Sequence, residues 1–167
     1  AMKRMVDDFR DYARTPAPQL AAVDLNSLVQ EVLGLYEGST AKISLQLAAS
    51  LPPVHGDATQ LRQIIHNLLR NAEDAQEGMV HQEIGVLTRC VDGMAELAVR
   101  DCGTGFPPEI MARVFEPYVT TKARGTGLGL AIVKKIVEKH GFRLRLTCEM
   151  DGIAFQYFLN KFHIIYD

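Results

Sequence analysis

The feature that most constrains the fold of this 167-residue chain is a glycine cluster that runs directly into a helical segment. The cluster is Gly125-Thr126-Gly127-Leu128-Gly129-Leu130, and the residues from Gly127 to His140 predict a helix that ends at Gly141. Glycines at a helix N-terminus combine exposed backbone N–H groups with the positive end of the helix dipole, an arrangement that binds phosphate. Such turns also occur for packing alone, so the rest of the chain must show whether a nucleotide pocket accompanies the cluster.

Composition excludes several classes of function. With 47% hydrophobic and 23% charged residues the chain is ordinary globular protein, and its net charge of −2 offers no basic surface for nucleic acid. No apolar run is long enough to span a membrane, so we expect no membrane contact by these residues. Cys90, Cys102 and Cys148 are odd in number and lack CxxC spacing, which favours a reduced, cytoplasmic setting without disulfides or a zinc site.

Three more helices are predicted from apolar residues at helical spacing. They cover residues 2–13, 25–36 and 57–77. Asp24 and Asp57 are good N-caps, and Asp57 with Gln60 three residues later resembles a capping box. At the C-terminus of the fourth helix, His140 is expected to act as a favourable cation.

Strands and turns complete the predicted fold. Alternating residues predict a strand over 42–48, and the turns Asp92-Gly93 and Asp151-Gly152 predict hairpins over 83–100 and 143–159. Helices mixed with antiparallel strands indicate an α+β, two-layer sandwich.

The chain is expected to divide at its prolines. Residues 1–15 form an isolated helix, 16–23 an extended linker, 24–160 the main domain and 161–167 an apolar tail. A single short helix has little stability in water, so we expect residues 1–15 to pack on a partner or on a second copy.

Two asparagines stand one turn apart in the 57–77 helix. Asn67 and Asn71, at positions i and i+4, lie one above the other beside the apolar stripe, where asparagine is a poor helix former. Their amide oxygens could hold Mg²⁺ or its waters beside phosphates. The alternative is a solvated polar face.

Two further segments have candidate chemistry. In Asp101-Cys102-Gly103-Thr104-Gly105, a carboxylate at a strand end can accept a hydrogen bond from an exocyclic amine while glycine backbone admits a flat ring. The loop over 114–122 places Thr120, Thr121 and Lys122 where they could close over phosphates. A plain turn and a surface loop are the alternatives. The chain has no GxxxxGK[ST], and Leu130 takes the last glycine position of GxGxxG, which excludes the P-loop and dinucleotide folds.

Taken in order, these segments resemble the ATP-binding domain of sensor histidine kinases, in the GHKL family that includes gyrase, Hsp90 and MutL. Residues 67–72 are similar to the N box, 101–106 to the G1 box, 115–122 to the F box and 125–130 to the G2 box. Residues 5–14 and 115–122 are also similar to the nitrogen-regulation (NtrY-type) subgroup. The resemblance implies the Bergerat fold, a mixed, largely antiparallel sheet packed on about three helices.

The resemblance also implies ATP and Mg²⁺ as cofactors and gives roles to the site residues. Asp101 would bind the adenine amino group, Asn71 would ligand Mg²⁺ with Asn67 as a second candidate, and Asn67 and Lys122 would be catalytic. Thr120, Thr121 and Lys122 would approach the γ-phosphate. The remaining binding positions are backbone contacts, at Gly103 and Gly105 for adenine and at Gly125, Thr126, Gly127, Leu128 and Gly129 for phosphates.

Asn67 bears on the reaction. The family's ATPase clamps carry glutamate here as a general base, and an amide cannot take a proton from water. The resemblance therefore implies transfer of the γ-phosphoryl group to a partner histidine. None of the five histidines has the family's acceptor context, and residues 1–15 resemble the end of the helix that belongs to the dimerisation and phosphotransfer domain.

The partners implied are the histidine-bearing dimerisation domain of the same kinase and a response regulator. The whole protein is expected to be a homodimer and a membrane-anchored bacterial sensor kinase, with this part cytoplasmic. Asp74, Ala75 and Ile153 depart from the family's pattern and keep a degenerate, non-catalytic module open. A GHKL ATPase clamp is the other alternative, which Asn67 disfavours.

Overall fold

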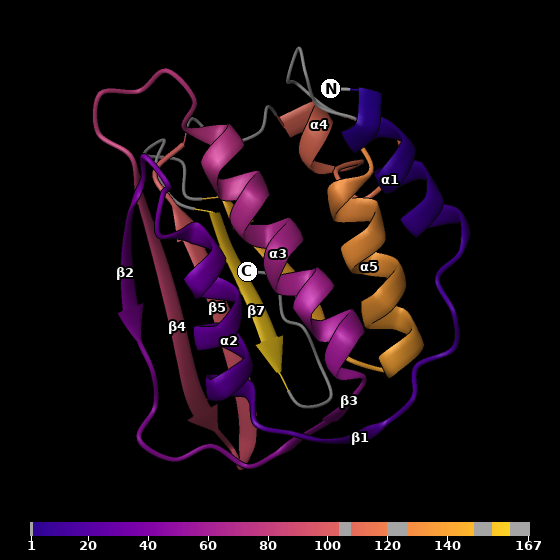
Figure 1. The fold of residues 1–167 in the computed structure, drawn as a ribbon, viewed down its shortest axis with the longest axis vertical. Helices are drawn as coiled ribbons and strands as arrows, with labels where there is room; N and C mark the ends of the chain where they lie inside the picture. The colour runs from indigo at the N-terminus through magenta and orange to yellow at the C-terminus, as the bar shows by residue number, and fades with distance from the viewer. Residues whose placement is uncertain (1, 104–107, 120–126, 149–154, 161–167) are drawn as a thin grey trace.

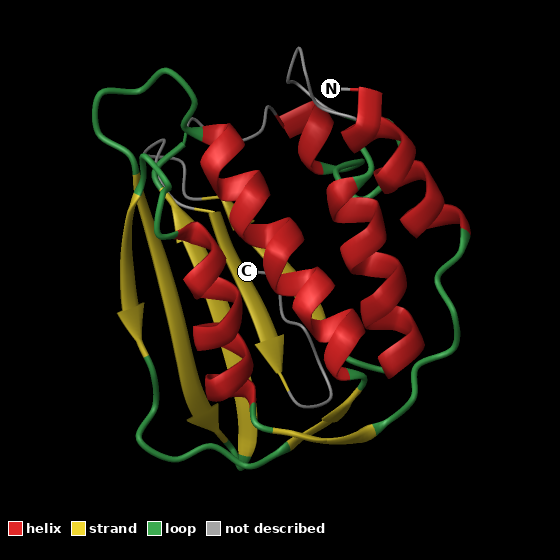
Figure 2. Ribbon diagram, in the orientation of Figure 1, coloured by secondary structure: helices red, strands yellow, loops and turns green. Residues whose placement is uncertain are grey.

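Helices cover one face of a mixed sheet in the computed structural model of the chain (Figure 1; Figure 2). The structure describes residues 2–103, 108–119, 127–148 and 155–160. The helices are α1 (Met2–Ala13), α2 (Leu25–Leu33), the 3₁₀ turn η1 (Gly34–Tyr36), α3 (Ala58–Ala75), α4 (Pro108–Met111) and α5 (Gly129–His140). The strands are β1 (Ala21–Val23), β2 (Lys42–Gln46), β3 (Val54–Gly56), β4 (Glu83–Val91), β5 (Met94–Asp101), β6 (Leu144–Cys148) and β7 (Phe155–Asn160).

The main sheet is mixed and largely antiparallel, as predicted. Among the described residues its strand order is β2-β4-β5-β7-β6, with β2 parallel to β4 and every other neighbouring pair antiparallel. The β4–β5 hairpin turns at Asp92 (φ 52°) and Gly93 (φ 76°), the left-handed pair that a tight Asp-Gly turn requires. The second predicted turn, 151–152, lies outside the described residues, but β6 and β7 pair antiparallel as expected.

The core lies between the sheet and helices α2, α3 and α5. On α3 the predicted apolar stripe is fully buried, comprising Leu61, Ile64, Ile65, Leu68 and Leu69. It faces alternate residues of the central strands, such as Val86 and Leu97, while Ile132 and Ile136 of α5 close the layer beside it. Because α3 and α5 pack side by side, residues at matching heights on the two helices become neighbours.

Several sequence predictions need correction at element ends. Helix α2 ends at Leu33 and continues as η1, and β2 ends at Gln46 rather than at residue 48. Strands β1 and β3 form a two-stranded antiparallel sheet that was not predicted, because three-residue strands are too short to show periodicity.

The N-terminus of α3 is capped by a different set of contacts from the one predicted. The Asp57 carboxylate accepts the N–H of Gln60 at 3.2 Å as expected, but the Gln60 side chain donates to the carbonyl of Pro16. The N–H of Asp57 donates instead to Nε2 of His140. In this contact Nε2 of His140 is a hydrogen-bond acceptor, which differs from the cationic role expected at the end of α5.

Helix α1 forms as predicted and packs on the outside of the helical layer, beside α5 (Figure 1). Its apolar stripe does not face the domain. Met2, Met5, Val6 and Phe9 are all more than half exposed. No helix in the described part of the chain is both long enough and apolar enough to cross a bilayer.

Candidate functional site

The face of α3 that carries the two asparagines looks toward the start of α5. Asn67 is 5% exposed and Asn71 is half-buried, so Asn67 does not belong to a solvated face. Its Oδ1 lies 3.8 Å from the point where a Cβ on Gly129 would stand. The two residues are 62 positions apart in the sequence, and the packing of α3 on α5 brings them together.

The N-terminus of α5 is built from the second half of the glycine cluster. Leu128 holds the cap position and is buried, and a leucine side chain cannot accept a hydrogen bond from the first-turn N–H groups. Gly127 has φ of 71° and would place a Cβ 2.4 Å from the carbonyl carbon of Tyr118. The N–H of Tyr118 donates to the Gly127 carbonyl at 2.9 Å. This close contact, which only glycine allows, joins the loop over 114–119 to the start of α5.

Asp101 ends strand β5 on the same face as Leu97 and Val99, the face that the helices cover. It is fully buried, and its Oδ1 accepts the N–H of Gly103 at 2.8 Å. A Cβ on Gly103 would stand 2.8 Å from the carbonyl oxygen of Ala75, so the last turn of α3 lies directly against this turn. The carboxylate is therefore held in a fixed direction beside the C-terminal end of α3.

The neighbouring thiol is not an activated nucleophile. Burial, with the carboxylates of Glu83 and Asp101, raises the pKa of Cys102. The chemistry of this end of the sheet therefore depends on the carboxylate and not on the cysteine.

The structure gathers the described candidates at one end of the molecule. The C-terminal half of α3, the end of β5 and the start of α5 all lie at the top of Figure 1. These elements hold Asn67, Asn71, Asp101 and Gly129, and the residues directly next to them include Gly103, Gly127 and Leu128. Gly105, Thr120, Thr121, Lys122, Gly125 and Thr126 lie outside the described residues.

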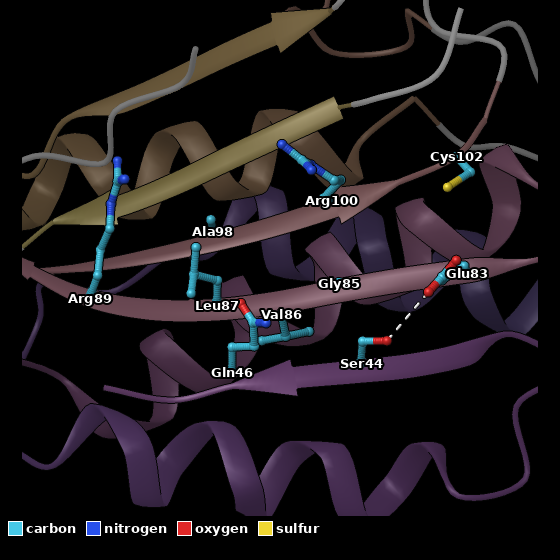
Figure 3. Close-up of a pocket in the computed structure, with 10 residues that line it drawn as sticks. All are labelled: Ser44, Gln46, Glu83, Gly85, Val86, Leu87, Arg89, Ala98, Arg100 and Cys102. Atoms are coloured by element: carbon cyan, nitrogen blue, oxygen red, sulfur yellow. Dashed lines mark hydrogen bonds between the residues drawn. The ribbon is translucent and has the colours of Figure 1, made fainter. Parts of the chain in front are cut away.

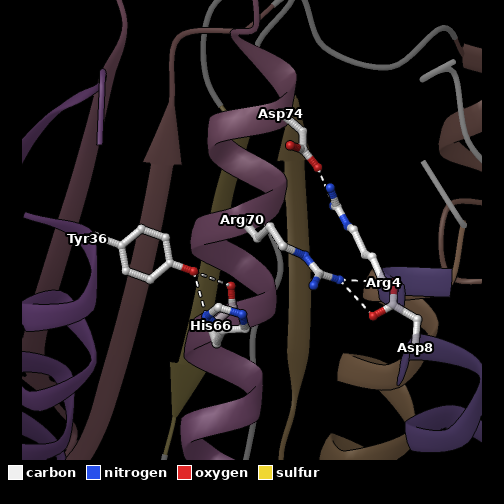
Figure 4. Close-up of polar contacts among 6 residues, drawn as sticks. All are labelled: Arg4, Asp8, Tyr36, His66, Arg70 and Asp74. Atoms are coloured by element: carbon white, nitrogen blue, oxygen red, sulfur yellow. Dashed lines mark hydrogen bonds and ion pairs between the residues drawn. The ribbon is translucent and has the colours of Figure 1, made fainter. Parts of the chain in front are cut away.

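Sequence reasoning missed a second set of charged residues at this end. Arg4 of α1 pairs with Asp74 of α3, and Asp8 pairs with Arg70 (Figure 4). The partners are 70 and 62 residues apart, so sequence spacing could not pair them. The available signal was the matched spacing, since each helix carries one arginine and one aspartate four residues apart.

On the other side of α3, the hydroxyl of Tyr36 contacts Nδ1 of His66 at 2.7 Å (Figure 4). Burial raises the pKa of Tyr36 and lowers the pKa of His66, so both are held neutral. A neutral, tyrosine-bonded histidine beside α2 is a packing element of the helical layer.

A separate cavity of about 450 Å³ opens on the opposite face of the sheet (Figure 3). It is lined from β2, β4 and β5 by residues such as Ser44, Glu83, Leu87 and Arg100. None of the predicted site residues that the structure describes lines it. The cavity and the candidate site therefore lie on different faces of the sheet.

Comparison with known proteins gives a consistent result. Residues 56–161 match the family described as histidine kinase-, DNA gyrase B- and HSP90-like ATPases. Over 141 residues the chain is 38% identical to the NtrY-like sensor histidine kinase of Rickettsia felis, a match that covers 83% of this chain and 24% of that protein. The chain thus spans about a quarter of the length of that relative.

Solved structures match as well. Full-length ShkA in complex with AMPPNP aligns with a TM-score of 0.81 and 28% identity, covering 99% of this chain and 37% of that one. The catalytic domain of the histidine kinase ThkA aligns with a TM-score of 0.74 and 27% identity, covering 86% of this chain and 96% of that domain.

Proposed function

The chain belongs to the family of histidine kinase-, DNA gyrase B- and HSP90-like ATPases, and from this premise we propose that it binds Mg-ATP between α3 and α5. We infer further that it delivers the γ-phosphoryl group to a histidine on another segment. The observation that carries the proposal is the proximity of Asn67 Oδ1 to Gly129, since a Cβ added at Gly129 would stand 3.8 Å from that oxygen. It brings a ligand suited to a hard cation next to a helix N-terminus, which favours phosphate.

The residues present fit this cofactor. The Asn67 and Asn71 amide oxygens are the type of donor that Mg²⁺ accepts, and Mg²⁺ keeps several waters besides. At Gly127 and Gly103 a Cβ would collide with neighbouring backbone. Both turns therefore carry no side chain, and their backbone is exposed to the site. ShkA, which aligns over almost the whole chain, was solved with the ATP analogue AMPPNP. When bound, Mg-ATP would supply the phosphoryl group and a cation that offsets the negative charge of the phosphates.

Each residue has a stated task in the proposal. Asp101 accepts a hydrogen bond from the exocyclic amine of adenine, with Gly103 and Gly105 admitting the ring. Asn71 ligands Mg²⁺, and Asn67 lies beside the metal and the phosphates. Lys122, with Thr120 and Thr121, neutralises and holds the γ-phosphate, while the N–H groups from Gly125 to Gly129 hold the others.

Asn67 decides between transfer and hydrolysis. An amide cannot remove a proton from water, so the site lacks a general base at this position. The γ-phosphoryl group is then available to an incoming imidazole, which is a nucleophile without deprotonation by the enzyme. The acceptor is the histidine of the dimerisation domain of the same kinase, and a response regulator receives the phosphoryl group from it. We place this part of a homodimeric sensor kinase in the cytoplasm.

The test is a calorimetric titration of the whole chain with Mg-AMPPNP, comparing wild type with Asp101→Asn. The matched control is Asp92→Asn, the same change in the turn at the opposite end of the β4–β5 hairpin. We expect Asp101→Asn to weaken binding about tenfold, as the loss of a charged hydrogen bond predicts, and Asp92→Asn to leave it unchanged. Mixing the wild-type chain with ATP and the histidine-bearing segment should yield phosphohistidine.

The outcomes separate the parts of the proposal. If folded wild-type chain does not bind Mg-AMPPNP, the nucleotide site is wrong. If binding is intact and Asp101→Asn behaves like Asp92→Asn, the adenine contact is wrong. Steady ATP hydrolysis by the chain alone would contradict the role given to Asn67.

A further inference from the structure

Helices α1 and α3 are joined by two ion pairs. In one pair α1 supplies the arginine, and in the other it supplies the aspartate. Arg4 Nη2 lies 2.6 Å from Asp74 Oδ2, and Arg70 Nη2 lies 2.9 and 3.0 Å from the two oxygens of Asp8 (Figure 4). Residues four apart lie on one face of a helix. Both pairs therefore form together only when the helices run antiparallel in a single register.

The second pair is too buried to be a casual surface contact. The side chain of Asp8 is 4% exposed and that of Arg70 is 23% exposed. A carboxylate buried to this degree is strongly destabilising once its partner is removed. Lys135 of α5 adds a hydrogen bond to the carbonyl of Tyr12 and lies 4.7 Å from the centre of the Tyr12 ring. Helix α1 is thus docked in a defined position on the domain.

The first pair lies beside the candidate nucleotide site. Asp74 follows Asn71 by three residues, so the two side chains share a face of α3. A bare carboxylate beside bound phosphates would repel them. Arg4 supplies the opposite charge. Its Nε is buried and, within the described residues, has no hydrogen-bond partner, so the guanidinium has a donor that Asp74 does not use.

We propose that α1 completes the nucleotide site through Arg4, which cancels the charge of Asp74 next to Asn71. Docking of α1 then strengthens binding of Mg-nucleotide, and by linkage bound nucleotide strengthens docking of α1 by the same factor. The proposal rests on the proposed function, because it requires Mg-ATP at Asn71. It gives Asp74, a departure from the family's pattern, a partner on another helix.

The experiment is a titration of the whole chain with Mg-AMPPNP for wild type, Arg4→Gln, Asp74→Asn and the double variant. Arg10→Gln is the matched control, since Arg10 is also on α1 but is exposed and pairs only loosely with Asp7, at 3.8 Å. We expect Arg4→Gln to weaken binding about fivefold or more, within the usual range of coupling between sites. Arg10→Gln should match wild type. Arg4→Gln in the Asp74→Asn background should have no further effect.

A second measurement monitors the docking of α1 on the domain directly. Hydrogen exchange at the α1 amides should slow when Mg-AMPPNP binds wild type, and should not respond to nucleotide in Arg4→Gln. If Arg4→Gln alone is poorly folded, the double variant Arg4→Asp with Asp74→Arg is used. It restores the ion pair with the two charges exchanged between the helices. That variant should bind Mg-AMPPNP as tightly as wild type.

Three results would overturn the inference. Equal affinities of Arg4→Gln and Arg10→Gln would remove Arg4 from the site. Weaker binding by Asp74→Asn in both backgrounds would make Asp74 a ligand instead of a repelling charge. Failure of the exchanged pair, in a folded sample, would show that the contact does not act through charge. Absence of Mg-AMPPNP binding by the wild type would instead defeat the proposed function. Binding by the wild type and by Arg10→Gln, with loss in Arg4→Gln, concerns this inference alone.

Discussion

The backbone N–H of Asp57 donates to Nε2 of His140 at 3.0 Å and ties the start of α3 to the end of α5. Nδ1 of the same ring lies 2.9 Å from the carbonyl oxygen of Ile136, so with Nε2 as the acceptor Nδ1 is the donor. The start of α3 and the end of α5 lie at the bottom of Figure 1, whereas the C-terminal half of α3 and the start of α5 lie higher. This hydrogen bond therefore fixes how the two helices run toward the candidate site.

Replacing His140 with alanine should destabilise the domain. The N–H of Asp57 would lose its acceptor, and a hydrogen bond of this kind contributes about 1 kcal/mol. Urea unfolding at pH 7.5, where histidine is mostly neutral, measures the change. His81→Ala removes an exposed histidine and should have no effect. Equal unfolding free energies for the two variants would contradict the role given to this hydrogen bond.

Replacing Asp57 with alanine should make stability less dependent on pH in the acid range. Burial alone would raise the pKa of Asp57, but the backbone N–H groups of Gln19, Gln60 and Thr59 lower it further than burial raises it. A carboxyl whose pKa is lower in the folded state stabilises the fold above its unfolded pKa of about 3.9. That contribution disappears as the pH falls through the folded pKa.

At pH 7 we expect Asp57→Ala to cost about 0.5 to 2 kcal/mol, the usual effect of losing an N-cap. The difference in the free energy of unfolding between wild type and variant should become steadily smaller below about pH 4. Unfolding by urea at a series of pH values gives the comparison. Glu37→Ala, at an exposed carboxylate, provides the control. If the difference in the free energy of unfolding stays constant with pH, the charge of Asp57 does not contribute to stability.

Gly103→Ala should disturb both stability and nucleotide binding. The new Cβ would stand 2.8 Å from the Ala75 carbonyl oxygen and 2.9 Å from Asp101 Oδ1, so backbone must move. Overpacking of this kind costs about 1 to 3 kcal/mol, and the shift displaces Asp101. Thermal unfolding and a Mg-AMPPNP titration measure the two effects.

The matched control for this substitution is Gly34→Ala. Gly34 has nothing within 4 Å of the Cβ position and has right-handed helical φ of −57°. Alanine there should stabilise the domain by about 0.4 to 1 kcal/mol. If the two alanines have the same effect, the close contact with Ala75 has no energetic importance.

Local chemistry explains which parts of the fold could be predicted. The Asp92-Gly93 turn and the buried stripe of α3 depend on residues close in sequence, and both are confirmed. The parallel pairing of β2 with β4 joins residues about 40 positions apart and has no local signal. The sheet of β1 and β3 was missed because each strand has only three residues.

The candidate site shows the same division. Asn67 and Asn71 were found because they are poor helix formers one turn apart beside the apolar stripe, and Asp101 because it is a carboxylate at a strand end followed by glycines. Arg4 was not found, since a charged residue on a predicted helix is ordinarily solvated. Its importance depends on a helix packing that brings it to Asp74, and Thr120, Thr121 and Lys122 stay predictions because they lie outside the described residues.

Helix α1 meets the domain mainly through charges and keeps its four large apolar side chains in water. Separation of the two would therefore wet mostly ionic groups, with Tyr12 as the main aromatic exception. Such an interface can open and close without exposing a new apolar surface that would favour aggregation. Its strength should follow ionic strength, so the surroundings of the protein can tune how long the helix stays attached.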